Sequence, residues 1–325
     1  MRGIAEVFAN STGVVRSVRS AFRRRRRFVL HVEQVLGTSL ELSLVAERQE
    51  CAQRAERAVF DEIDRLSEIL SGYVATSELR RWQERVDCDA VVSTELVEVL
   101  ELAESCRVRT NGAFNAGVKA IVDALAECGD PGAAVSKIQS PMWRIDRDRG
   151  VARRLLDVPI SLDAIAKGFI VTRAASAASN VPGVTDVLLN IGGDIQLVGA
   201  GERWIGIADP RNPAENVAPL TRVRISNEAV ATSGSYRRGF VAAGVRHSHI
   251  IDPRTGRPPT DVISASVIAP DCATADALST AFSVLSPAES VALADTVDGA
   301  ACLIVARDGT ITTNSLWTHH ESVSL

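Results

Sequence analysis

Apolar side chains recur along this chain with two different periods, one typical of helices and the other of strands. Across 47–72 they return every three or four positions among charged residues, and Gly72 follows, which predicts an amphipathic helix. The same spacing predicts further helices over 95–106, 114–128, 161–178 and 274–285. Ser161 is the expected N-cap of the helix over 161–178, because a serine hydroxyl can accept from the free N–H groups of a first turn.

Strands are predicted where apolar residues alternate with polar ones or form short runs. Leu40, Leu42 and Leu44 alternate within the segment 28–46, which Gly37-Thr38 divides into two extended pieces. One or two strands are expected within 141–160, and single strands over 184–190, 204–208, 221–226, 240–242, 249–251, 262–268 and 301–306.

The order of these elements indicates the fold class. Helices dominate the first half and short strands the second, which favours an α+β fold over a doubly wound parallel sheet. No linker or repeat interrupts 28–325, so we expect one intertwined domain there. Residues 1–27 form a polar, basic lead-in whose order the pattern does not decide.

Charge and cysteine usage narrow the function classes. The net charge of −4 gives no overall cationic field for nucleic acid. The run Arg23–Arg27 suits a solvated arm, or else a peripheral contact with phosphates or an anionic membrane surface. The six cysteines include no CxxC pair, which argues against zinc and predicts buried free thiols. We expect a cytoplasmic location, since neither a secretory pattern nor an apolar run of membrane-spanning length appears.

Two segments have the character of anion sites. Ser161 to Gly168 places small residues at a helix start with Lys167 one turn in, so that backbone N–H groups and the positive dipole end can face an anion. Asn190-Ile191-Gly192-Gly193-Asp194 follows an apolar strand, where paired glycines let a ligand approach the backbone. Each segment by itself also fits an ordinary helix start or turn.

A second pair of segments could supply a metal ligand set and a base. Asp276 and Thr280 are four apart on one helix face, and a carboxylate with a hydroxyl suits Mg²⁺, although both also fit structural roles. His249 could act as a general base near neutral pH or be structural. The stretch 231–238 is rich in hydroxyls around Gly234 and could bind phosphate or simply turn.

Taken in order, these motifs resemble a known family, the ApbE-like FAD:protein FMN transferases. The motifs are Asp-Ala-Ile-Ala-Lys-Gly (163–168), Asn-Ile-Gly-Gly-Asp (190–194), Trp-Ile-Gly-Ile-Ala-Asp-Pro (204–210), Ala-Thr-Ser-Gly-Ser-Tyr-Arg-Arg (231–238), His-Ile-Ile-Asp-Pro-Arg-Thr-Gly (249–256) and Ala-Asp-Ala-Leu-Ser-Thr-Ala (275–281). Weaker matches are Leu36-Gly37-Thr38, Tyr73 with Ser77-Glu78-Leu79, and Asn111-Gly112-Ala113-Phe114.

The resemblance implies an α+β, T-fold-related domain and Mg²⁺-dependent cleavage of FAD. FMN would pass in phosphoester linkage to a Thr or Ser of an acceptor protein, such as a subunit of a redox-driven ion pump or reductase, with release of AMP. By position, Asp276 and Thr280 would ligate the metal through side chains and Ala164 through its carbonyl, with His249 and Asp276 catalytic. The FAD site would comprise Leu36, Tyr73, Ala113, Phe114, Asn115, Ser161, Lys167, Asn190, Gly192, Gly193, Asp194, Ser233, Gly234 and His249.

The chain departs from the usual pattern of this family in its expected site. Ser161 stands where an aspartate is usual, with an acidic residue displaced to Asp163, and Asn115 replaces a second aspartate. Each change removes one negative charge. Two alternatives therefore stay open beside the transferase: an FAD pyrophosphatase that frees FMN, and a non-catalytic FAD-binding protein.

Overall fold

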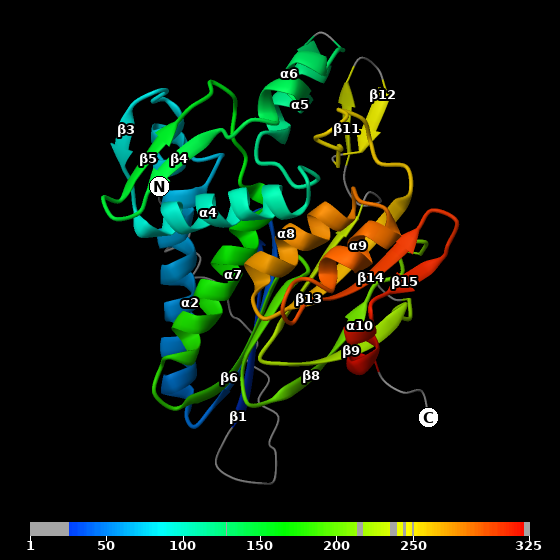
Figure 1. Ribbon diagram of the computed structural model, residues 1–325. Helices are drawn as coiled ribbons and strands as arrows, with labels where there is room; N and C mark the ends of the chain where they lie inside the picture. Colours follow the sequence, from blue (N-terminus) through cyan, green and yellow to red (C-terminus); the bar gives the residue numbers. More distant parts are fainter. Residues whose placement is uncertain are drawn as a thin grey trace.

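A computed structural model describes residues 26–127, 129–212, 217–234, 239–242, 245–248 and 250–321. Its centre is an eight-stranded sheet in the order β1-β2-β6-β7-β10-β13-β14-β15, in which each neighbouring pair is antiparallel (Figure 1). The strands are β1 (Arg26–Val35), β2 (Thr38–Ala46), β6 (Val184–Ile191), β7 (Asp194–Gly199), β10 (Ala229–Gly234), β13 (Val262–Ala269), β14 (Ala301–Ala306) and β15 (Ile311–Thr313).

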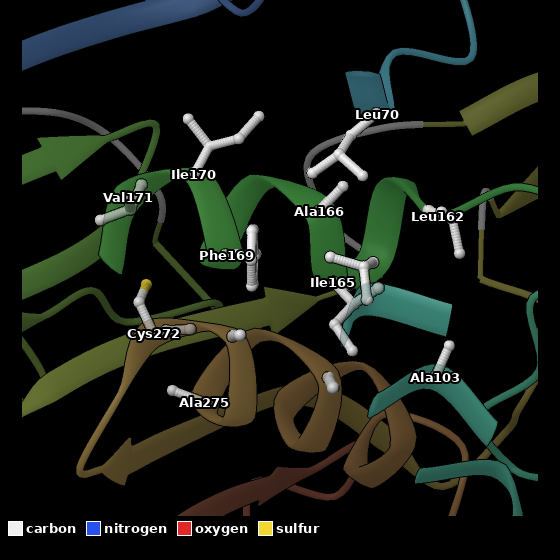
Figure 2. Packing of buried hydrophobic residues seen from close by; sticks show 14 of the residues in the cluster. Leu70, Ala103, Leu162, Ile165, Ala166, Phe169, Ile170, Val171, Cys272 and Ala275 are labelled. Carbon is white, nitrogen blue, oxygen red and sulfur yellow. The ribbon is translucent and has the colours of Figure 1, made fainter. Parts of the chain in front are cut away.

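Helices cover one face of this sheet, with α7 and α8 side by side on its central strands (Figure 1). The longer helices are α2 (Gln49–Leu70), α4 (Thr94–Arg109), α5 (Val118–Glu127), α7 (Asp163–Ser179), α8 (Cys272–Phe282) and α9 (Pro287–Ala294). In Figure 2, Phe169 of α7 points toward α8 and Cys272, within the large apolar core on this side of the sheet.

A smaller apolar core lies on the opposite face of the sheet, under the ribbon β8 (Glu202–Ile207) and β9 (Thr221–Ser226) and the short helix α10 (Ser315–His320). Alternate residues of β14 serve the two cores: Cys302 and Ile304 belong to the helical side, and Leu303 and Val305 to the other. Because both faces of β14 are covered, the strand is apolar along the whole run 301–306, whereas a strand with one face in water would alternate between apolar and polar residues.

The remaining elements are short and lie around these layers. They are α3 (Glu78–Gln83), α6 (Gly132–Ile138), the small sheet of β3 (Asp89–Val91), β5 (Val151–Arg154) and β4 (Trp143–Asp146), and the hairpin of β11 (Gly239–Ala242) and β12 (Val245–Ser248). No helix in the described part of the chain is both long and apolar enough to cross a membrane.

The structure confirms the α+β class and corrects several local predictions. Helix α7 begins at Asp163 with Leu162, not Ser161, in the N-cap position, and the Leu162 side chain makes no capping hydrogen bond. Helix α5 begins at Val118 rather than 114, because Asn115 Oδ1 accepts from the Gly117 N–H and shapes a turn there. Residues 250 and 251 are not in a strand, and β1 already starts at Arg26, within the expected lead-in. The rest of that lead-in, 1–25, lies outside the described residues.

The cysteines behave largely as expected. Five are described and all are free; Cys51, Cys106, Cys272 and Cys302 are buried, whereas Cys88 is exposed, contrary to expectation. Burial raises the pKa of Cys106 and of Cys302 to about 12. These two thiols are therefore protonated at neutral pH and are not suited to act as nucleophiles.

The contact between α7 and α8 generates a stability prediction. A Cβ atom at Gly168 would lie 2.3 Å from the Cys272 carbonyl oxygen and 2.9 Å from Ala273 Cα, both backbone atoms that cannot rotate away. We expect Gly168→Ala to force the helices apart and to cost about 1–3 kcal/mol of unfolding free energy, measured by urea denaturation.

Gly72→Ala is the matched control, since the added Cβ would meet only Asp163 Oδ1, at 3.9 Å. It should change the unfolding free energy by less than about 1 kcal/mol. Equal stability of the two variants would show that α7 and α8 can move apart at no cost.

Candidate functional site

The site begins where α8 meets the first turns of α7. Asp276, in the second turn of α8, is buried, and its Oδ2 accepts from the Gly168 N–H at 3.2 Å. Gly168 follows Ala164 by four residues, so its N–H is the donor that helical geometry directs at the Ala164 carbonyl. The Asp276 carboxylate therefore lies beside the Ala164 carbonyl, an approach that the missing side chain of Gly168 permits.

A cationic side chain from the same turn of α7 reaches the sheet. Lys167 Nζ forms an ion pair with the buried carboxylate of Asp194, the first residue of β7. The turn before it is held by Asn190 Oδ1, which accepts from the Gly193 N–H at 3.0 Å. Gly192 and Gly193 have φ of +62° and +97°, a left-handed backbone that glycine adopts without strain.

The glycine turn forms a common rim with the turn between β1 and β2. The Gly192 N–H donates to the Ser39 carbonyl at 3.0 Å, and a Cβ at Gly192 would lie 2.6 Å from Thr38 Cγ2. Leu36, two residues before Thr38, is 37% exposed at this rim. Antiparallel pairing of β2 with β6 thus brings together two predicted segments that are far apart in the sequence.

Hydroxyl groups surround Thr280 at the junction of α8 with β10. Ser233 Oγ lies 3.0 Å from Ser279 Oγ and 3.3 Å from Thr280 Oγ1, and the Ser279 hydroxyl donates to the Asp276 carbonyl at 3.0 Å. Gly234 follows Ser233 as the last residue of β10. Ser279 was not among the site residues predicted from the sequence. Its position one turn after Asp276 could have suggested it, but its hydrogen bond with Ser233 depends on how α8 packs on β10.

The surroundings of Asp276 disfavour the ionised form of its carboxyl group. Burial raises the pKa of the Asp276 carboxyl, Lys167 and the Gly168 N–H lower it, and the negative charge of Asp163 raises it further. A divalent cation beside Asp276 would offset the cost of burying this charge.

The available donors match one class of metal ion. Among the described residues, no group of three or more His, Cys, Asp or Glu side chains could hold a metal. A single carboxylate, a hydroxyl and a carbonyl are hard oxygen donors that suit Mg²⁺, which keeps waters and binds substrate phosphate rather than demanding a full protein cage. The residues at Asp276, Thr280 and Ala164 therefore fit Mg²⁺.

The predicted stretch Ala113-Phe114-Asn115 builds a loop with its side chains. Ala113 and Phe114 lie in the apolar core, so the Phe114 ring is not available for stacking. Asn115 Oδ1 accepts from the Gly117 N–H at 2.9 Å, and its Nδ2 donates to the Ile138 carbonyl at 3.0 Å. A carboxylate could not make the second bond, which explains an amide here. The backbone of this stretch is what remains to contact a ligand.

Ser161 and Tyr73 both meet the start of α7. The Ser161 N–H donates to the Ala116 carbonyl at 2.8 Å, and its Oγ accepts from the Asp163 N–H at 3.3 Å, so Ser161 joins the 113–117 loop to the helix. The Tyr73 hydroxyl donates to Asp163 Oδ2 at 3.0 Å. Asp163 was noted in the sequence only as a displaced acid and not as a site residue.

His249, the predicted base, lies outside the described residues. The segment after it forms a turn, with the Gly256 N–H donating to the Asp252 carbonyl at 2.8 Å. The Asp252 carboxylate accepts from the Arg254 backbone and guanidinium at 2.9 Å, and Gln139 Nε2 donates to the Pro253 carbonyl. This turn is therefore fixed beside the loop that carries Gln139.

Comparison with known proteins decides the family. The model of the ApbE family matches residues 36–304, most of the chain. This chain belongs to the ApbE family. Two curated relatives are FAD:protein FMN transferases: that of Treponema pallidum is 31% identical over 317 residues, covering 88% of this chain and 86% of its own, and that of Vibrio cholerae is 30% identical over 267 residues, covering 76% and 79%.

Solved ApbE structures share the fold. The ApbE protein of Thermotoga maritima superposes with a TM-score of 0.80 at 26% identity, covering 91% of this chain and 99% of its own. The flavinyl transferase ApbE of Pseudomonas stutzeri, in its apo form, gives 0.77 at 21% identity, with 94% and 100% covered, and supports the fold alone. The predicted ApbE-like α+β fold and the assignment to the flavin transferases are confirmed.

The buried Asp276 leads to a stability prediction for the metal-free protein. Because burial raises its pKa, the carboxyl stabilises the fold most when protonated, and this contribution is lost as the pH rises above its ordinary pKa of 3.8. At pH 7 we expect Asp276→Asn to melt at a higher temperature than the unsubstituted protein, with the difference narrowing as the pH is lowered. Differential scanning calorimetry in the presence of a chelator measures both.

Adding Mg²⁺ should reverse the order, because only the carboxylate gains a partner. A lower melting temperature of metal-free Asp276→Asn at pH 7 would show that Lys167 and the Gly168 N–H outweigh the cost of burial.

Proposed function

We propose that this ApbE-family chain is a magnesium-dependent FAD:protein FMN transferase. It cleaves the pyrophosphate of FAD, attaches FMN through a phosphoester bond to a Thr or Ser hydroxyl of an acceptor protein, and releases AMP. The observation that carries the proposal is the buried Asp276 carboxylate beside the first turn of α7, with Thr280 and Lys167 close to it. Curated relatives that cover most of this chain carry the same activity in their names.

Three groups of the chain would hold the metal: the Asp276 carboxylate, the Thr280 hydroxyl and the Ala164 carbonyl. When bound there, Mg²⁺ supplies neutralisation of pyrophosphate charge and stabilisation of the leaving AMP. The Ser233 hydroxyl, which is itself bonded to the Ser279 hydroxyl, restricts the rotation of the Thr280 side chain, so that its oxygen is presented in one direction.

Lys167 and the glycine turn orient the diphosphate. The ammonium group of Lys167 is fixed by its ion pair with Asp194, so it need not be ordered when the substrate arrives. Gly192 and Gly193 place no side chain over the turn, which lets phosphate oxygens approach the backbone there closely. Phosphoryl-group transfer depends mainly on such alignment and charge stabilisation.

The acceptor hydroxyl must lose a proton as its oxygen attacks. The new bond joins this oxygen to the phosphorus of the FMN half, and the bond from that phosphorus to the bridging oxygen breaks, so that AMP leaves with the bridging oxygen. We assign the proton to His249, because a neutral imidazole is an effective base near pH 7.

Incubation with FAD, Mg²⁺ and a purified candidate acceptor tests the proposal directly. Mass spectrometry should show the acceptor heavier by one FMN less one water, together with AMP. Asp276→Ala should reduce the transfer rate by at least a hundredfold, since it removes the one carboxylate of the proposed ligand set. Asp61→Ala, which removes an exposed carboxylate on α2, should transfer normally.

Other outcomes identify the competing functions. Unchanged FAD cleavage by Asp276→Ala would overturn the metal assignment. Free FMN with an unmodified acceptor would identify a pyrophosphatase, and FAD that is bound but not cleaved would identify a flavin-binding protein.

A further inference from the structure

An exposed tyrosine at the edge of the candidate site is fixed by a hydrogen bond. Tyr73, one of two tyrosines in the chain, is 85% exposed. A side chain so exposed normally keeps much of its rotational freedom, but its hydroxyl here donates to Asp163 Oδ2 at 3.0 Å. A hydroxyl bonded to a carboxylate is a charge-assisted donor, stronger than a neutral one.

The loop that carries Tyr73 is itself held in one conformation. Ser71 Oγ accepts from the N–H groups of Tyr73 and Val74 at 3.2 and 3.1 Å. The fully buried Ser77 donates from Oγ to the Ser71 carbonyl at 2.6 Å and accepts from the Arg80 N–H at 3.1 Å. Loop and ring are therefore ordered before any ligand binds.

The same loop is fixed against the start of α7. Leu70, the last residue of α2, points toward Ala166 of α7 in the apolar core (Figure 2). Gly72 also lies beside the start of α7, since a Cβ built on it would be in ordinary contact with Asp163 Oδ1, at 3.9 Å. Asp163 precedes Ala164, and the negative charge of Asp163 raises the pKa of Asp276. The tyrosine ring is thus anchored at the helix start that the proposed function assigns to FAD.

We propose that Asp163 is a positioning residue that holds the Tyr73 ring at the start of α7 as a stacking surface for an aromatic ring of FAD. The inference rests on the proposed function and adds Asp163 to it. A ring fixed in advance spares the cost of ordering it on binding, so part of the affinity for FAD comes from the Asp163 carboxylate without its touching the ligand.

Electrostatics alone makes the opposite prediction for this carboxylate. FAD carries a negatively charged diphosphate, and Asp163 is a negative charge close to Asp276, so removing it should strengthen FAD binding. Positioning predicts that removing it weakens binding. Tyr73→Phe separates the two effects, because it deletes the hydrogen bond and leaves every charge in place.

A double-mutant cycle on the full chain tests the proposal, with the dissociation constant of FAD measured by calorimetry at fixed Mg²⁺. Tyr73→Phe and Asp163→Ala should each weaken binding by about two- to tenfold. The double variant should be no weaker than the weaker single variant, because both remove one interaction. Asp163→Asn, which keeps an acceptor oxygen, should bind closer to the unsubstituted protein, and Asp61→Ala should bind like it.

Kinetics and melting separate positioning from general damage. In the transfer assay the KM for FAD should rise with kcat unchanged, and melting temperatures should stay equal. Titrations with FMN and with ADP show which ring contacts Tyr73: weakening confined to one of them supports the proposal. Additive effects in the cycle, tighter binding by Asp163→Ala, or equal weakening for FMN and ADP would overturn it. The unsubstituted protein failing to bind FAD would instead contradict the proposed function.

Discussion

The close approach of α7 to α8 at Gly168 is the constraint on which the candidate site depends. With any larger residue, a Cβ would collide with the Cys272 backbone, and the Gly168 N–H could not reach Asp276 Oδ2. This one contact places a carboxylate from α8 beside the carbonyl and the lysine of α7. The buried side chain of Gln196 reinforces it, since its Oε1 accepts from both the Thr172 hydroxyl of α7 and the Cys272 N–H of α8.

The helix contact also creates an electrostatic cost that links stability to function. Asp276 and Asp194 are both buried, and Lys167 is the ammonium group that faces them. A protein interior tolerates buried charge only when it is paired. Two buried carboxylates with one ammonium group favour the binding of a cation, and the proposed metal would supply the second positive charge.

Two departures from the usual family motifs are absorbed by local structure. The amide of Asn115 uses both its donor and its acceptor within the loop, and Ser161 connects that loop to the start of α7. Neither change leaves an unsatisfied side chain. The lost charges therefore have a structural explanation, and the acid at Asp163 has acquired a partner of its own in Tyr73.

The sequence by itself determined those features that depend on local periodicity. The apolar spacing in 47–72 gave α2, the run 301–306 gave β14, and a separation of four residues put Asp276 and Thr280 on one face of α8. It was wrong about a strand at 250–251, and about Ser161 as N-cap and the start of α5, where in both cases a side-chain contact to the backbone rather than periodicity sets the local conformation.

Only the tertiary structure decided which of these residues meet. The bonds from Ser233 to Ser279, Tyr73 to Asp163 and Gly168 to Asp276 join positions 46, 90 and 108 residues apart. Such pairings follow from the packing of helices on a sheet. The apolar faces bring distant segments together, but the apolar pattern in the sequence does not show which polar atoms will then meet. The sequence thus determined the chemistry available to this protein, and packing decided how that chemistry is arranged.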